Sequence, residues 1–117
     1  MDRKLDALRE RIRAFAAERD WDRFHSPKNL SMALAAEAGE LLEHFQWLTE
    51  EQSEALDAAK LAAVRHELAD VFIYLVRLAD RIGVDLLDAA AEKIEINAGK
   101  YPAERVRGDA RKYTEYD

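Results

Sequence analysis

The stretch Glu67-Leu-Ala-Asp-Val-Phe-Ile-Tyr74, continued by Leu75-Val-Arg-Leu-Ala-Asp-Arg-Ile82, decides the fold of this 117-residue chain. Its apolar residues surround the predicted helix almost completely, and no glycine or proline interrupts it before Gly83. A helix that is apolar all round is buried all round. A small domain rarely encloses one helix fully, so we expect this helix to meet a second copy of the chain. The alternative is a tightly wrapped monomer.

Helix-start and helix-stop residues predict further helices on both sides. Ser26 before Pro27 is a typical N-cap and first helical residue, and Thr49-Glu-Glu-Gln52 has the form of a capping box that opens a short helical piece. Gly83 stands where a C′ glycine ends a helix, and Tyr101-Pro102 breaks the last helix. The expected long helices run from about Leu5 to Arg19, Pro27 to Trp47, Ala59 to Arg81, and Asp85 to Ala98 or Gly99.

The composition favours one folded domain and excludes several kinds of site. Hydrophobic residues make up 49% of the chain, and only 4 Gly and 2 Pro interrupt it, as is typical of long helices. Cysteine is absent, which excludes disulfides, thiolate catalysis and Cys-ligated zinc. The formal net charge of −6 disfavours binding to duplex nucleic acid. We expect an all-α four-helix bundle in a single domain over residues 1–117, in which 103–117 form an extended or mobile tail.

No segment of the sequence predicts export or insertion into a membrane. The stretch Met1-Asp-Arg-Lys-Leu-Asp6 is charged and lacks the apolar region of a signal peptide. The longest apolar-rich stretch, Leu68 to Ile82, contains four charged residues and is too short to span a bilayer. We therefore expect no membrane association and a cytoplasmic location, with which the absence of cysteine is compatible.

Two pairs of acidic residues, each at i, i+3 spacing, mark the two central helices. Glu37 and Glu40 lie in the second expected long helix, and Glu67 and Asp70 lie in the third. Successive helical residues are about 100° apart, so each pair falls within about 60° and forms a narrow polar stripe on an apolar cylinder. If the stripes face each other, four carboxylates converge. Buried carboxylates must then protonate, pair with cations or bind metal.

The chemistry of these side chains favours Mg²⁺, with Mn²⁺ as the alternative, if they hold a metal. Both ions prefer hard oxygen ligands, retain some water and accept substrate phosphates. A di-iron carboxylate bundle instead requires Glu-x-x-His on two helices, and no glutamate here is followed by histidine three residues later. The alternative to a metal site is a pair of solvated faces with salt bridges to Arg65, Arg77 or Arg81. The pattern alone does not decide between them.

Four segments, spread over nearly the whole chain, form a more specific pattern. They are Asp20-Trp-Asp-Arg-Phe-His-Ser-Pro-Lys-Asn-Leu30, Glu37-Ala-Gly-Glu-Leu-Leu-Glu-His-Phe-Gln-Trp47, Glu67-Leu-Ala-Asp-Val-Phe-Ile-Tyr74 and Lys93-Ile-Glu-Ile-Asn-Ala-Gly-Lys-Tyr-Pro102. In this combination the chain resembles the MazG-like all-α NTP pyrophosphohydrolases, and within them the dCTP pyrophosphatase branch. The resemblance implies a MazG-like four-helix bundle, assembled as a homodimer or homotetramer. It implies Mg²⁺-dependent conversion of a dNTP, dCTP or a modified dCTP first, to dNMP and pyrophosphate.

The resemblance also implies roles for individual residues. The family's metal-binding motifs match Glu37, Glu40, Glu67 and Asp70 as Mg²⁺ ligands. The segment containing Trp21 and His25 matches the substrate loop of the branch. Trp47 matches the second tryptophan of the branch, and Tyr74 matches its tyrosine after the second acidic motif. Three residues near the end of the chain match the family's phosphate-side residues. In all, the substrate-binding residues expected from the resemblance are Trp21, His25, Trp47, Tyr74, Lys93, Asn97 and Tyr101.

The expected reaction is attack of a water molecule on the α-phosphorus, with Glu40 or Glu67 orienting or deprotonating that water. Trp21 and Trp47 could sandwich the base, because stacking contributes about 1–3 kcal/mol per base. Ile12 stands where animal members of the branch carry a histidine that helps to hold the nucleotide, so the base preference stays open. The alternatives are the same reaction on dUTP or a damaged dNTP, and a non-enzymatic helical dimerisation module.

Overall fold

The computed structural model describes residues 3–115, except the side chain of Tyr113, and all of the regular structure in this range is helical. The chain divides into two compact units, Met1–Gly83 and Val84–Asp117. The expectation of a single domain stays a prediction. The elements are α1 (Arg3–Glu18), the 3₁₀ turn η1 (Asp22–Phe24), α2 (Pro27–Glu43), α3 (Glu50–Ser53), α4 (Ala58–Ile82), α5 (Leu86–Lys100), α6 (Ala103–Val106) and the 3₁₀ turn η2 (Tyr113–Glu115).

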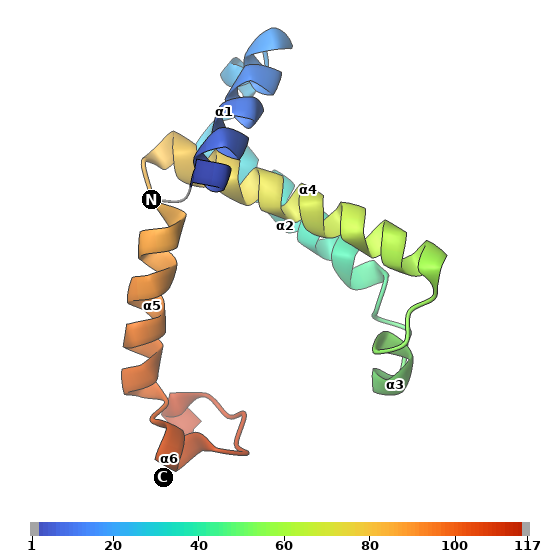
Figure 1. Ribbon diagram of the computed structural model, residues 1–117, viewed down its shortest axis with the longest axis vertical. Coiled ribbons are helices and arrows are strands. Elements are labelled where there is room, and N and C mark those ends of the chain that lie inside the picture. Colours follow the sequence, from blue (N-terminus) through green and yellow to red (C-terminus); the bar gives the residue numbers. More distant parts are fainter. Residues whose placement is uncertain (1–2, 116–117) are drawn as a thin grey trace. The chain divides into compact units, whose positions relative to one another are not determined.

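The first unit is built on α2 and α4, which lie side by side along most of their length (Figure 1). The connection through α3 returns the chain, so that α4 runs antiparallel to α2 (Figure 1). Helix α1 packs on the C-terminal half of α4, where Arg13 and Asp80 form an ion pair. The small core of this unit consists of Ala16, Leu30, Val64, Val76 and Ala79.

Local side-chain caps begin these helices where the sequence predicts. The Ser26 hydroxyl accepts a hydrogen bond from the Asn29 backbone N–H at 3.1 Å, which satisfies one of the free donors at the start of α2. Thr49 and Gln52 form the reciprocal capping box at the start of α3. Asp57 caps α4 in the same way through Lys60 N–H at 2.8 Å.

The C-terminal end of α2 differs from the prediction. The helix ends at Glu43, not near Trp47, and the chain continues through a tight turn in which the Phe45 N–H donates to the Leu42 carbonyl at 2.9 Å. No glycine or proline marks this end in the sequence. Trp47 therefore lies in the turn between α2 and α3, and it is 86% exposed.

Helix α4 ends as predicted, but one of its faces is uncovered. Gly83 adopts a left-handed conformation with φ 74°, which ends the helix at Ile82. The expected burial on all sides is not present within the first unit, where Leu68 is 52% exposed and Phe72 is 43% exposed. Neighbouring exposed apolar residues on this helix are Leu61, Ile73, Leu75 and Ile82.

The second unit consists of α5 and a short C-terminal segment. Asp85 caps α5 through the Asp88 N–H at 3.0 Å. The helix ends at Lys100, slightly beyond the expected Ala98 or Gly99, and the predicted break at Tyr101-Pro102 follows. The following segment was expected to be an extended or mobile tail, and within it Ala103–Val106 form one turn of helix. The expected tail ends in residues 116–117, which lie outside the described part of the chain. Within residues 3–115, no helix is long and apolar enough to cross a bilayer.

Candidate active site

Three of the four predicted carboxylates lie together between the two long helices of the first unit. Glu37 comes from α2, whereas Glu67 and Asp70 come from consecutive turns of α4. One carboxylate oxygen from each lies within 4.8 Å of the others. The antiparallel packing of α2 and α4 therefore brings the two polar stripes face to face, a condition that the helical periodicity of the sequence left open.

These carboxylates are held close together without enough hydrogen-bond donors. Glu37 Oε2 and Glu67 Oε2 are buried and have no hydrogen-bond partner in the structure. The adjacent Glu67 carboxyl, burial and the adjacent Glu40 raise the pKa of Glu37 to about 7. Like charges at this distance disfavour full ionisation of the group. An external cation would remove this repulsion, and hard oxygen ligands suit Mg²⁺ or Mn²⁺.

Glu40, the fourth predicted ligand, lies one turn after Glu37 on α2 and is exposed. It is near enough to raise the pKa of Glu37, both by hydrogen bonding and by its charge. It is not part of the group of three whose oxygens converge. The structure thus places Glu40 at the edge of the group, where it faces solvent.

An aromatic pocket of about 340 Å³ adjoins the carboxylates. Trp21 and His25 from the η1 segment and Tyr74 from α4 line it, together with Ile12 from α1. Asp70 belongs both to this wall and to the converging carboxylates, so the two features are contiguous. The remaining lining residues are Leu8, Arg11, Phe15, Ala16, Ile73 and Arg77. Three of the predicted substrate-binding residues, Trp21, His25 and Tyr74, therefore share one pocket.

The aromatic residues of the η1 segment are held by packing and by one buried arginine. The Trp21 ring meets the Phe15 ring edge-on, with centroids 5.7 Å apart, and the His25 ring at 6.2 Å. Arg77 on α4 donates to Asp22 Oδ1 at 2.5 Å and to His25 Nδ1 at 3.2 Å. The sequence placed Arg77 near the acidic stripe as a possible salt-bridge partner, but did not predict its place in the pocket.

The other predicted substrate residues are Trp47 in the first unit and three residues of the second unit. Trp47, in its exposed turn, does not line the pocket that contains Trp21. Lys93 and Asn97 lie on α5, and Tyr101 follows as its C-cap, so all three belong to the second unit. Lys93 and Asn97 are exposed within that unit, and Tyr101 is half-buried.

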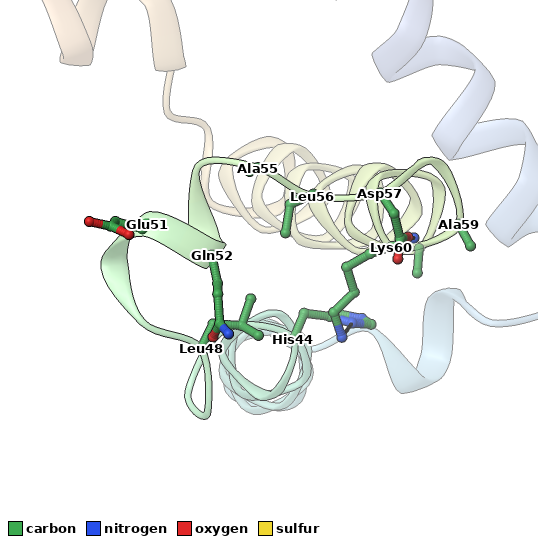
Figure 2. Close-up of a pocket in the computed structure, with 10 residues that line it drawn as sticks. His44, Leu48, Glu51, Gln52, Ala55, Leu56, Asp57, Ala59 and Lys60 are labelled. Carbon is green, nitrogen blue, oxygen red and sulfur yellow. Dashed lines mark hydrogen bonds between the residues drawn. The ribbon is translucent and has the colours of Figure 1, made fainter.

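A larger, open hollow of about 820 Å³ lies at the α3 end of the first unit (Figure 2). Figure 2 shows Lys60 and His44 pointing toward each other across it, and their side-chain nitrogens are 3.3 Å apart. Leu48, Leu56 and small alanines form much of the remaining wall. None of the predicted site residues lines this hollow, so size alone does not identify the functional site.

Residues 32–116 match the MazG-like family. The chain belongs to the MazG-like family. That range includes the three converging carboxylates, Tyr74 and the predicted residues of the second unit. Trp21 and His25 precede it.

Relatives of this MazG-like chain include dCTP pyrophosphatase 1 of Homo sapiens, to which it is 48% identical over 113 residues. That alignment covers 95% of this chain and 66% of the human protein. The Bos taurus protein of the same name is 46% identical and is covered to 67%. The chain thus spans just under two thirds of the length of the human relative.

The fold is similar to that of a pyrophosphatase from Archaeoglobus fulgidus, known from a crystal structure. The TM-score is 0.82 at 34% sequence identity. The superposition covers 87% of this chain and 95% of the archaeal one. The all-helical architecture therefore agrees with that of a solved protein over most of both chains.

Proposed function

We propose that this protein hydrolyses a deoxynucleoside triphosphate to the monophosphate and pyrophosphate, with dCTP or a modified dCTP as preferred substrate. The observation that carries the proposal is the continuity of the carboxylate group with the aromatic pocket through Asp70. Such an arrangement can hold metal-bound phosphates at one end and a base at the other. The names of the relatives, dCTP pyrophosphatase 1, support this choice of reaction and base.

The carboxylates fit Mg²⁺, with Mn²⁺ as the alternative. The two unpartnered buried oxygens, Glu37 Oε2 and Glu67 Oε2, are hard donors that need a cation. Glu37, Glu67 and Asp70 would hold the ion, and Glu40 would join them from the edge of the group. When bound, the metal lowers the pKa of coordinated water and neutralises phosphate charge.

The protein's own residues position the reactants. Glu40 or Glu67 orients, or accepts a proton from, the water that attacks the α-phosphorus. Trp21 stacks on the base, and Tyr74 forms another part of the pocket wall. Lys93, Asn97 and Tyr101, all in the second unit, contact the phosphate groups, since a lysine supplies a point charge for phosphate. Ile12 lines the pocket and gives the base an apolar contact.

The assembly is a homodimer or homotetramer. Leu61, Leu68, Phe72 and Leu75 fall within about 60° on α4 and form one uncovered apolar stripe. A stripe of this length on a helix is typical of a surface that packs against another helix. Trp47 lies outside the pocket of its own chain, so its proposed stacking contact would be made within the assembly. The cytoplasmic location expected from the sequence stays a prediction.

A panel of nucleotides with pyrophosphate detection tests the proposed reaction. The panel contains the four common dNTPs, dUTP, 5-methyl-dCTP and an oxidised dNTP, each with Mg²⁺ and with EDTA. We expect Mg²⁺-dependent pyrophosphate release that is fastest with dCTP or 5-methyl-dCTP. Fastest release from dUTP or the oxidised dNTP would move the assignment to that nucleotide. No release from any nucleotide would favour a non-enzymatic dimerisation module.

A further inference from the structure

The buried guanidinium of Arg77 separates two hollows of the first unit. Arg77 lies on α4 and is only 4% exposed. On one side it lines the aromatic pocket of about 340 Å³. On the other side it lines a polar hollow of about 380 Å³, together with Arg13, Asp22 and Asp80. A charged group buried at this position needs partners, and it has three.

Each nitrogen of the Arg77 guanidinium faces a different side chain. Nη2 donates to Asp22 Oδ1 at 2.5 Å, and Nη1 lies 3.8 Å from Asp80 Oδ2. Nε donates to His25 Nδ1 at 3.2 Å. Asp80 is itself held from α1 by Arg13, whose Nε donates to Asp80 Oδ2 at 2.6 Å. The Arg77 guanidinium is thus held between the carboxylates of Asp22 and Asp80, and its Nε–H points at Nδ1 of His25.

This contact determines which nitrogen of His25 carries the proton. A neutral imidazole has one N–H donor and one acceptor nitrogen. Because Nδ1 faces the N–H of Arg77, Nδ1 must accept, and the hydrogen is on Nε2. In a charged His25 both ring nitrogens carry hydrogen, so its Nδ1–H would face the Nε–H of Arg77. Among the residues that the structure describes, Nε2 has no hydrogen-bond partner, and His25 lines the pocket.

We propose that Arg77 is a positioning residue that holds His25 neutral, with its hydrogen on Nε2, so that His25 donates a hydrogen bond to an acceptor atom of the bound nucleotide. The identity of the ligand as a nucleotide rests on the proposed function, whereas the tautomer rests on the geometry alone. A cytosine offers two such acceptors, O2 and N3. Phosphate and sugar oxygens are acceptors as well.

The charges around His25 agree with a neutral ring. Burial, followed by the charge of Arg77, lowers the pKa of His25 below its usual 6.5, and Arg81 acts in the same direction. Asp22 on η1 raises this pKa, but ranks below both burial and Arg77. The pocket is also lined by Arg11 from α1 and Asp70 from α4. His25 therefore stays neutral at pH 7.

Nitrogen NMR of the full-length protein labelled with ¹⁵N-histidine reads the tautomer directly, without nucleotide or metal. A His25→Gln spectrum assigns the His25 signals among the three histidines. At pH 7 we expect an unprotonated Nδ1 and a protonated Nε2. In Arg77→Met the tautomers should mix, and the pKa of His25 should rise toward 6.5. An Nδ1–H or charged ring in the wild type, or an unchanged ring in Arg77→Met, would overturn the proposal.

Arg81→Met is the matched control, because it removes an equal charge one turn away on α4 but no hydrogen bond to His25. Its His25 should keep the hydrogen on Nε2. If Arg77→Met does not fold, Arg77→Lys tests the same point, since an ammonium keeps the charge but loses the planar fork. Its tautomer preference should weaken, and retention of the wild-type ring state in this variant would count against the proposal.

Kinetics test the consequence of the tautomer for the ligand. Arg77→Met should raise KM for the best nucleotide about tenfold, with a smaller change in kcat, because a ground-state hydrogen bond is misdirected. An equal loss in kcat at constant KM would contradict the positioning role. If no nucleotide is hydrolysed, the proposed function fails while the NMR result still decides the role of Arg77.

Discussion

Asp70 belongs both to the converging carboxylates and to the wall of the aromatic pocket, so its substitution is the sharpest test of the proposed site. Asp70→Asn keeps the shape of the side chain but removes a charge from the converging group. We expect pyrophosphate release to fall by about 100-fold or more at limiting Mg²⁺, since a lost ligand weakens metal-assisted charge stabilisation by several kcal/mol. Glu43→Gln, at the exposed end of α2, is the matched control. Full turnover by Asp70→Asn would contradict the site.

Substitution of Glu37 tests the group of converging carboxylates through the thermal stability of the protein. It faces other carboxylates and has an unpartnered buried oxygen, so metal-free protein is under electrostatic repulsion. Glu37→Gln removes one of the like charges and should raise the melting temperature measured in EDTA at pH 8. The variant should also lose most of the Mg²⁺-induced rise of the wild type, because a ligand stabilises only the state that binds it. A lower melting temperature in EDTA, with the Mg²⁺ response intact, would argue against a metal role for Glu37.

At the scale of elements, the contact of α1 with α4 depends on Asp80. The hydrogen bond from Arg13, opposed by burial and aided by the Arg13 charge, lowers the pKa of Asp80 below its usual value. A lowered pKa stabilises the fold above the unfolded-state pKa, and this stability is lost as pH falls through the folded-state pKa. Asp80→Asn should therefore lower the melting temperature by a few degrees at pH 7. The difference should shrink at pH 3, and an equal difference at both pH values would contradict this account.

The end of α4 depends on the left-handed conformation of Gly83. A Cβ at this position would meet no neighbouring side chain or distant backbone within 4 Å, so the φ of 74° alone determines the cost of a side chain. Gly83→Ala should lower the free energy of unfolding by about 1–2 kcal/mol in denaturant titrations. Gly83→Asn should cost less, because asparagine tolerates this conformation. Equal stability of Gly83→Ala and the wild type would show that the cap is not strained.

Features set by residues a few positions apart, such as helix caps and acidic stripes, can be predicted from the sequence. Contacts between residues far apart in the chain cannot. Ser26 and Asp85 cap helices through residues three positions away, and the two acidic stripes follow from helical periodicity. The end of α2 has no glycine or proline signal, so the helix was expected to continue to Trp47. Arg77 meets Asp22 and His25, which are 55 and 52 residues away, and only the packing of η1 on α4 reveals that contact.

At the scale of the whole molecule, the exposed apolar stripe on α4 offers a test of the proposed homo-oligomer. Leu68 and Phe72 lie at i and i+4, and about half of each is exposed within the first unit. Because apolar burial contributes about 25 cal/mol per Å², a helix with such a stripe gains stability by packing against a second copy. Phe72→Glu should therefore shift the protein toward monomer in light scattering after size exclusion. Glu54→Lys, at the exposed C-cap of α3, should leave the mass unchanged. A wild-type monomer would show that the stripe is not a contact between copies.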